Sequence, residues 1–419
     1  MKQPQPILFT HYGENWIRGS ERCLLDLLSH IDRTVFKPVL WCNNPALARE
    51  ARDLDISTYE SRFTILFHFD APRFPVLNYL RLVREGLRIV RAHDIQLLHS
   101  NSAAPNQWLV PVARQARRPL LVHLHAPYGQ RERFTLGLHQ ASLAVGVSQG
   151  CVEGLVAEGM APERVRVIYN GVDTTLLASG DERGLRARLG IGPDEIVLTR
   201  VGSLIHRKGV DLMLQAFAEL LGIHPRCHLL VVGEGPDRQE LQALAGRLGI
   251  DRRVHFTGLV PSAGAVLRDA TDLAVSPARS EGFGLTVIEA GAFGLPVVAT
   301  DTPGMREILT NEENGLIVPV ENVPALVAAL ARLVSDPATR RRFGQALRET
   351  VERRFSIQRY VREFEETYAE LLDRPRKEFG WSGPHTRFAS YRKWLGAAAG
   401  RMVRRRRGRI QHLVSRSAR

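Results

Sequence analysis

The sequence predicts an α/β fold of two domains, each built on a parallel β-sheet. Its 419 residues exceed what a single hydrophobic core ordinarily holds, so two domains are expected. Short apolar runs of strand length alternate with longer runs of helical periodicity, which is typical of a parallel sheet covered by helices on both faces. This alternation ends near residue 173 and begins again after a polar stretch at 179–188.

The first series opens with an apolar strand and a helical run. The spacing of apolar residues indicates a helix soon after the first strand, and these residues are Cys23, Leu24, Leu27, Leu28 and Ile31. A second helical stretch covers 76–92. The expected strands of this series lie at 6–10, 39–41, 95–99, 120–123 and 143–147.

The second series repeats the pattern and is followed by a helix without a strand. Its expected strands lie at 196–198, 228–232, 254–256, 273–275 and 296–299. Because no strand follows the helical run at 357–372, we expect it to return to the first domain. The expected organisation is a first domain at 1–172, a second at 173–355, the returning helix at 356–372 and a basic tail at 373–419.

The net charge of +13 is concentrated in the tail. Residues 373–419 hold 14 Arg and Lys against two acids, whereas the rest of the chain holds 43 basic and 42 acidic residues. The body therefore has the balanced charge of an ordinary enzyme. No module of basic and aromatic residues typical of nucleic-acid binding occurs in the body, so no specific nucleic acid is expected as a partner.

Cysteine usage and hydropathy favour a cytoplasmic protein. The four cysteines have no paired spacing, which argues against a disulfide framework and against a zinc site. The amino terminus has only a short apolar run at 7–9, so no secretory signal is expected. No stretch approaches the roughly 18 apolar residues that a membrane span requires.

The segment 280–290, with sequence SEGFGLTVIEA, is the most informative part of the chain. It follows an expected strand, contains two glycines and leads into a helix that begins near Leu285. Glycines let the backbone approach a ligand closely, and free amides at a helix start favour an anion such as a diphosphate. Glu281 and Glu289 beside a phosphate would repel it unless they bind hydroxyls, as on a ribose and a sugar. From spacing alone, a loop Glu and a solvated helix Glu remain an equal alternative.

Glu281 and Glu289, eight residues apart in this setting, resemble the paired-Glu motif of the retaining family 4 glycosyltransferases, which have the GT-B fold. The resemblance covers roughly residues 6–372, because several further segments occur in the family's order. They are VRVIYNGVD at 165–173, VGSL at 201–204 with RKG at 207–209, VVGEGP at 231–236, VHFTG at 254–258, GLPVVAT at 294–300 and NGL at 314–316.

The resemblance implies how a nucleotide-sugar donor is held. It implies that Glu289 binds the ribose and that Glu281 binds the sugar ring. The diphosphate would meet Arg207, Lys208 and the amides near 284–286. The expected donor-binding residues are Gly19, Phe283, Gly284, Leu285, Thr286 and Glu289, and the expected catalytic residues are His125, Arg207, Lys208 and Glu281.

Arg207 and Lys208 are expected to replace a metal ion. A departing nucleoside diphosphate gains negative charge, which fixed cations stabilise most in the transition state. Many family members carry Arg directly after the glycine of this loop, whereas this chain has Ser203, so we infer that Arg207 supplies the guanidinium. The Asp53-Leu54-Asp55 triplet lies far from any phosphate-loop signature. We therefore expect neither a metal ion nor another cofactor.

His125 ends an expected strand at the carboxyl edge of the sheet, where α/β proteins bind ligands. It resembles the family histidine placed against the transferred sugar, where a neutral imidazole can hydrogen-bond a hydroxyl. A packed or capping histidine is the alternative. Gly19 resembles the family glycine that opens the first helix near the donor phosphate. His11 and His99, also at strand ends, are expected to be packing residues.

Two basic segments raise the question of a membrane. The helix at 77–91 presents Arg81, Arg84, Arg88 and Arg91 on one face, for which a surface helix is favoured over a docking helix. Segment 388–410 interleaves aromatic and apolar residues with cations, which suits the headgroups of an anionic membrane. A disordered solubilising tail and an incidental nucleic-acid-binding run are the alternatives for the tail.

The sequence thus predicts a metal-independent hexosyl glycosyltransferase. Its expected donor is a UDP- or GDP-sugar and its acceptor a glycan or a lipid-linked molecule, as in the synthesis of surface polysaccharides or glycolipids. The tail would hold the enzyme on the inner face of an anionic membrane. A nicotinamide-dependent oxidoreductase is a rival, but the loop after the first strand lacks Gly-x-Gly-x-x-Gly. A nucleic-acid binder is the other rival.

Overall fold

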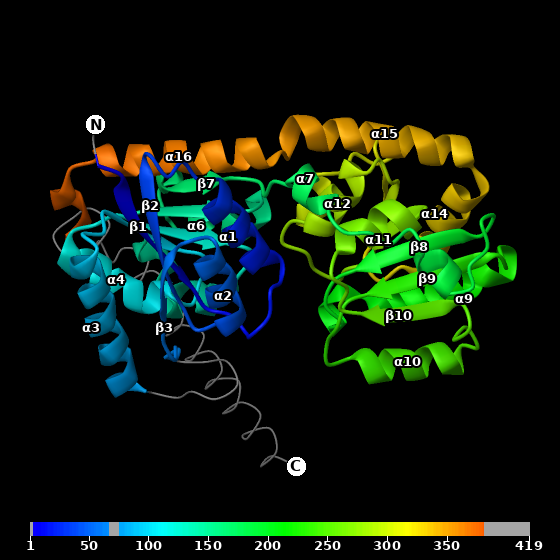
Figure 1. Cartoon of the computed structure of the whole chain (residues 1–419), viewed down its shortest axis with the longest axis horizontal. Helices are drawn as coiled ribbons and strands as arrows, with labels where there is room; N and C mark the ends of the chain where they lie inside the picture. Colours follow the sequence, from blue (N-terminus) through cyan, green and yellow to red (C-terminus); the bar gives the residue numbers. More distant parts are fainter. Residues whose placement is uncertain (1–2, 67–74, 381–419) are drawn as a thin grey trace, which may run out of the picture.

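The computed structural model describes residues 3–66 and 75–380, which form two α/β lobes side by side (Figure 1). Each lobe is a parallel sheet with helices on its faces, as the alternating pattern predicts. The two-domain α/β fold expected from the sequence is therefore confirmed. The tail segment 388–410, for which a membrane contact is expected, lies outside the described residues.

The first sheet has seven parallel strands in the order β3-β2-β1-β4-β5-β6-β7. The strands are β1 Gln5–His11, β2 Phe36–Cys42, β3 Ser57–Glu60, β4 Leu97–Ser100, β5 Leu120–Leu124, β6 Leu143–Gly146 and β7 Val165–Val167. Its helices are α1 Gly19–His30, α2 Pro45–Asp53, α3 Val76–Ala92, α4 Asn106–Ala116, α5 Gln130–Thr135 and α6 Gln149–Ala157.

The second sheet has six parallel strands in the order β10-β9-β8-β11-β12-β13. The strands are β8 Ile196–Val201, β9 Cys227–Val232, β10 Val254–Gly258, β11 Leu273–Ser276, β12 Val297–Thr300 and β13 Leu316–Val318. Its helices are α9 Val210–Ile223, α10 Arg238–Arg247, α11 Ala263–Ala270, α12 Leu285–Ala292, α13 Pro303–Arg306, α14 Val323–Ser335 and α15 Pro337–Arg354. Two short helices, α7 Thr174–Leu177 and α8 Leu185–Arg188, lead into it.

Both sheets reverse their strand order at one point, which positions the candidate site. The order reverses between β1 and β4 in the first sheet and between β8 and β11 in the second. Open α/β sheets bind ligands in the crevice outside the carboxyl ends of the strands at such a point. The loops after β8 and β11 carry the cations at 207–208 and the segment 280–284. The loop after β1 leads to Gly19.

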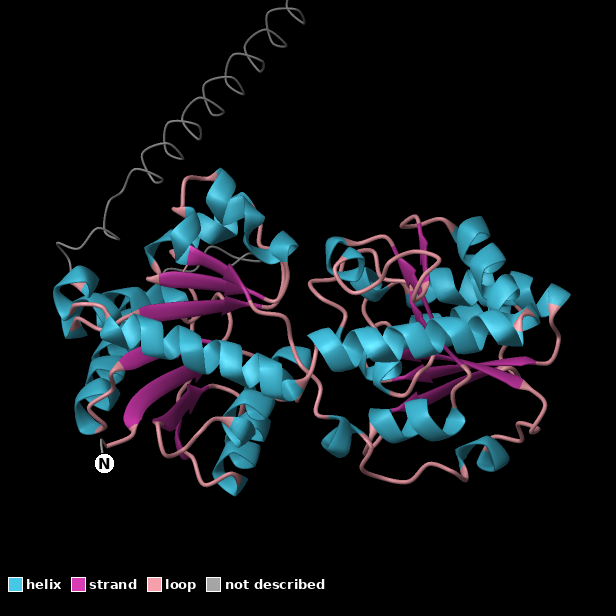
Figure 2. Ribbon diagram, turned by 90° about the horizontal axis from the view of Figure 1, so that it is seen from above, coloured by secondary structure: helices cyan, strands magenta, loops and turns pink. Residues whose placement is uncertain are grey.

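Helix α16 Ile357–Asp373 returns to the first lobe, as the sequence predicts for 357–372, and runs along it in line with α15 (Figures 1 and 2). Its aromatic side chains are buried in the same apolar cluster as β1 and α1. The hydroxyl of Tyr368 lies 2.7 Å from His99 Nδ1, and that of Tyr360 donates to the Cys23 carbonyl. Val172 pairs with Ser356, so the chain crosses between the lobes twice at one place.

All four cysteines are free and buried. No helix in residues 3–66 and 75–380 has the length and apolar content needed to cross a bilayer. Over the same residues, the His, Cys, Asp and Glu side chains form no group of three or more arranged to hold a metal ion. Helix α3 exposes the four arginines expected on one face, namely Arg81, Arg84, Arg88 and Arg91.

Candidate functional site

The second domain brings three charged side chains of the expected site together. Lys208 ends a 3₁₀ turn, His206–Lys208, directly before α9, and its ammonium donates to the Glu281 carboxylate. Arg207 lies 3.9 Å from Glu281 and donates to the Ser280 carbonyl at 2.7 Å. The loops after β8 and β11 therefore meet through a cation–carboxylate cluster.

Burial makes this cluster electrostatically strong. Burial lowers the pKa of Lys208 although Glu281 acts in the opposite direction. Burial alone would raise the pKa of Glu281, but Lys208 and Arg207 outweigh it and hold that pKa below its usual value. Glu281 is therefore a carboxylate at neutral pH, and Lys208 forms an ion pair with it. In this partly dry position, a charge acts on its neighbours more strongly than it does in water.

A third cation, Arg200, lies beneath the loop. It is 2 % exposed at the end of β8, and burial lowers its pKa to about 10. Its guanidinium donates to the carbonyls of Gly202 and Ser203, at 2.8 Å for the latter. From the sequence, Arg207 is expected to supply the guanidinium that this loop lacks after its glycine. The structure adds Arg200, which fixes the backbone of that loop from below.

Glycine is required where the two domains touch. A Cβ atom on Gly282 would lie 2.3 Å from the His125 carbonyl oxygen, so only glycine permits this approach. The Ser148 hydroxyl, at the start of α6, donates to the Gly282 carbonyl at 2.5 Å. Gly284 has a φ of 110°, a left-handed conformation that favours glycine, and it precedes the first turn of α12. The segment 282–284 thus carries the free amides of α12 to the edge of the first domain.

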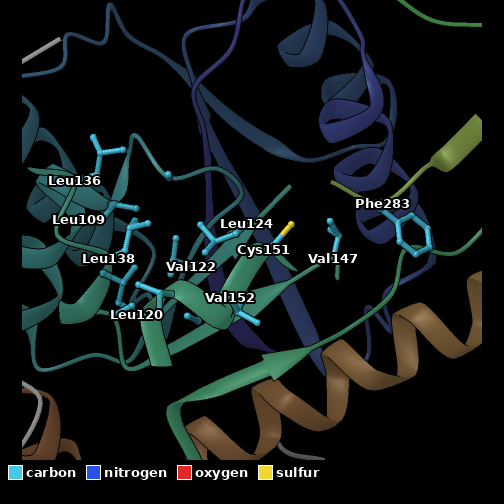
Figure 3. Packing of buried hydrophobic residues seen from close by; sticks show 14 of the residues in the cluster. Leu109, Leu120, Val122, Leu124, Leu136, Leu138, Val147, Cys151, Val152 and Phe283 are labelled. Atoms are coloured by element: carbon cyan, nitrogen blue, oxygen red, sulfur yellow. The ribbon is translucent and has the colours of Figure 1, made fainter. Parts of the chain in front are cut away.

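Phe283 anchors this segment between the domains. Its ring stacks on Tyr169 with centroids 5.9 Å apart and meets Phe355 edge-on at 5.5 Å. Figure 3 shows Phe283 beyond Val147 and Cys151, at the end of an apolar set that extends into the first domain. Because the side chain is 3 % exposed, Phe283 presents its backbone and not its ring to a ligand.

The first domain contributes a chain of hydrogen bonds. His125 follows β5, and its Nε2 lies 3.2 Å from Asn101 Oδ1 after β4. Asn101 Nδ2 lies 3.1 Å from His11 Nδ1 at the end of β1, and His11 Nε2 lies 2.8 Å from Glu21 in α1. Burial, and after it His123 and His11, keep the pKa of His125 well below its ordinary value, so the imidazole is neutral.

Most members of this hydrogen-bond network were not expected from the sequence. His125 was expected in the site, His11 was expected to be a packing residue, and Asn101 and Glu21 were not predicted. Burial would raise the pKa of Glu21, but the hydrogen bond and charge of His11 hold it at about 2. A signal was present, because His11 ends β1 and Asn101 directly follows β4, the two strands at the reversal point of the sheet.

The two helix starts expected at the donor face each other. A Cβ atom on Gly19, the first residue of α1, would lie 3.8 Å from the Leu285 side chain at the start of α12. Glu289 lies one turn further along α12, and Thr286 is partly exposed between them. Burial, with a further contribution from Asp26 on α1, raises the pKa of Glu289 to about 7.

Two parallel-sheet domains that meet through their strand ends in this way define a protein of the GT-B class. Family models agree with this class. Residues 17–176 match the model "Glycosyltransferase Family 4", and residues 181–350 match "Glycosyl transferases group 1". Since the two matches together cover most of the chain, the protein belongs to the group 1 and family 4 glycosyltransferases, as the resemblance in sequence suggests.

Curated relatives and solved structures carry related names. The D-inositol 3-phosphate glycosyltransferase of Kribbella flavida is 37 % identical over 198 residues, which are 45 % of this chain and 47 % of the relative. The match thus spans about half the length of that relative. The N-acetyl-alpha-D-glucosaminyl L-malate synthase of Bacillus anthracis is 24 % identical over 325 residues, covering 74 % of this chain and 84 % of the relative.

The structure of Anabaena Alr3699/HepE in complex with UDP and glucose is similar in fold. It has a TM-score of 0.75 and 24 % identity, and the superposition covers 87 % of this chain and 99 % of that chain. This similarity extends over both domains and supports the two-domain fold.

Proposed function

We propose that this chain is a glycosyltransferase that transfers a hexosyl unit from a UDP- or GDP-sugar, without a metal ion and with retention of anomeric configuration. The observation that carries the proposal is the cluster of Lys208, Arg207 and Glu281, placed beside the free amides of α12. Cations and helix-start amides bind a diphosphate, and a carboxylate among them binds hydroxyls. Anabaena Alr3699/HepE, which has a similar fold, has also been solved in complex with UDP-glucose, and this supports the same class of donor.

The cluster also suggests how the donor is engaged. Without donor, the Lys208 ammonium is neutralised by Glu281. When the diphosphate binds, its negative charge competes for Lys208 and Arg207, which releases the Glu281 carboxylate to accept hydrogen bonds from the sugar ring. As the bond to the sugar breaks, charge grows on the leaving diphosphate next to both cations. They therefore stabilise the transition state more than the bound donor.

The remaining residues have roles in the same pocket. Glu289 accepts hydrogen bonds from the ribose, and the amides of Gly284, Leu285 and Thr286 bind the phosphates. The backbones of Gly19 and Phe283 line the donor site, and His125 contacts the transferred sugar from the first domain. The acceptor, a glycan or a lipid-linked molecule, then lies along the first domain.

Transfer itself is the test. A panel of radiolabelled UDP- and GDP-sugars, incubated with the enzyme and a membrane extract, should label one acceptor fraction. We expect the product to keep the donor's anomeric configuration. EDTA should have little effect on the rate. Loss of activity on chelation that manganese or magnesium restores would contradict the metal-free assignment.

A membrane contact through the tail is part of the proposal. The sequence of 388–410 combines aromatic residues with cations, and each basic residue near an anionic surface contributes about 1 kcal/mol. The full chain should pellet with anionic liposomes at low salt and much less at high salt. Truncation after residue 380, which keeps the buried Phe379, should abolish pelleting but not donor binding. Equal binding to neutral vesicles, or no binding, would contradict this contact.

A further inference from the structure

The hydrogen bonds of Asn101 determine which nitrogen of His125 carries its proton. Asn101 Nδ2 donates to the Ser20 carbonyl at 3.1 Å and lies 3.1 Å from His11 Nδ1. A carbonyl oxygen only accepts hydrogen bonds, so the amide nitrogen must face Ser20. The amide oxygen, Oδ1, therefore faces His125 Nε2 at 3.2 Å. An amide oxygen accepts hydrogen bonds, so Nε2 is the protonated nitrogen of His125.

The Glu21–His11 pair contacts Asn101 from the other side. Glu21 is a carboxylate with a pKa of about 2, so His11 Nε2 must donate to it across 2.8 Å. The other nitrogen, His11 Nδ1, lies 3.1 Å from Asn101 Nδ2 and 3.3 Å from the Asn101 backbone carbonyl oxygen. The Glu21–His11 pair is therefore packed against Asn101, while the Ser20 carbonyl determines which way the amide faces.

The arrangement leaves one free acceptor on His125. A neutral imidazole with a proton on Nε2 carries a lone pair on Nδ1. Within residues 3–66 and 75–380, Nδ1 of His125 receives no hydrogen bond. His125 is half-buried, and its carbonyl touches the Gly282 loop of the second domain.

We propose that Asn101, oriented by the Ser20 carbonyl, is the positioning residue that fixes His125 as the Nε2-protonated tautomer and so presents Nδ1 as an acceptor for a substrate hydroxyl. This inference rests on the proposed function only for the identity of that hydroxyl. Nδ1 of His125 selects for a hydroxyl, because a hydroxyl can donate a hydrogen bond to it whereas an ether or carbonyl oxygen at the same place cannot.

The tautomer can be measured in the free enzyme. Long-range proton–nitrogen NMR on protein with nitrogen-15-labelled histidine distinguishes the two tautomers, and His125→Gln assigns the signal. We expect the Nε2-protonated form in the wild type. Asn101→Leu removes the acceptor and should yield a mixture or the other tautomer. Asn101→Asp keeps an oxygen facing Nε2 and should retain the wild-type tautomer. This variant provides a second test if Asn101→Leu fails to fold.

Asn106→Leu is the matched control. Asn106 is a buried asparagine of the same domain that donates to the carbonyls of Leu136 and Gly137 and does not contact His125. It should leave the His125 signal unchanged. With the proposed donor, Asn101→Leu should lower kcat about tenfold, the value of one hydrogen bond, while UDP or GDP binding stays unchanged.

The two proposals fail in different ways. An Nδ1-protonated His125 in the wild type, or an unchanged tautomer in a folded Asn101→Leu variant, would overturn the role of Asn101 whatever the enzyme transfers. If NMR shows the expected tautomers but neither UDP nor GDP binds, the role of Asn101 stands and the proposed nucleotide-sugar donor is contradicted.

Discussion

The two domains face each other with edges of opposite character. The edge of the second domain is charged, with Lys208, Arg207 and Glu281 in one cluster and Arg200 buried beneath it. The edge of the first domain presents the neutral His125, and its buried carboxylate Glu21 is paired with His11. In the proposed function, the charged edge binds and releases the diphosphate, and the edge with His125 orients hydroxyls.

Lys208→Ala should produce the largest effect. It removes a cation that acts on the leaving group, and we expect kcat to fall by roughly a hundredfold, from the loss of about 3 kcal/mol of transition-state stabilisation. Arg207→Ala, more exposed, should cost at least tenfold. Lys37→Ala, an exposed lysine on β2, is the matched control and should retain full activity. Normal kcat in Lys208→Ala would remove the charged edge from the mechanism.

The paired glutamates should separate the nucleotide from the sugar. Glu289→Gln should weaken binding of free UDP or GDP by about tenfold or more, since a hydrogen bond to a charged group contributes roughly 1.5–3 kcal/mol. Glu281→Gln should leave free nucleotide binding almost unchanged and lower the rate with the sugar nucleotide. Calorimetry on both variants checks this. Normal nucleotide affinity in both variants would show that the assignment of roles is wrong.

Gly282→Ala tests whether the two edges work as one site. The added methyl group would meet the His125 carbonyl, so the domains could not approach as closely. We expect activity to fall about tenfold with thermal unfolding nearly unchanged, as for a misplaced catalytic group. Gly246→Ala on α10, where an added Cβ meets nothing within 4 Å, is the control and should be fully active. Equal activity of the two variants would mean that close approach is not needed.

The smallest expected effect concerns pH. The pKa of Glu289, raised by burial and Asp26 to about 7, lies above the usual 4.5, so its ionisation destabilises the free protein. Stability present below pH 4.5 is lost as the pH rises through about 7. Glu289→Gln should therefore raise the free energy of unfolding at pH 8 by on the order of 1 kcal/mol and leave it unchanged at pH 4. The exposed Glu153→Gln should show no such pH dependence.

The same contrast explains what the sequence could predict. The two sheets and the helix at 357–372 follow from apolar periodicity. Contiguous motifs predict Lys208 and Glu281 as donor-site residues, but not the ion pair between them. The Glu21–His11–Asn101–His125 chain follows from neither, because its members lie on separate strands and a helix. Only the sheet register brings His11 and Asn101 together across 90 positions of sequence. The role of Arg200 could not be predicted for a related reason, because no local sequence signal distinguishes a buried arginine in a strand from an exposed one.

The most direct test of the charged edge is thermal unfolding with UDP, GDP, NAD and an oligonucleotide, each in large excess. A specific ligand raises the unfolding temperature by mass action, and at a hundred times its Kd it contributes about 2.7 kcal/mol. We predict that UDP or GDP stabilises the wild-type chain, that Lys208→Ala reduces the shift, and that NAD and the oligonucleotide give none. Stabilisation by NAD, or no response to either nucleoside diphosphate, would contradict the assignment of this edge to a nucleotide-sugar donor.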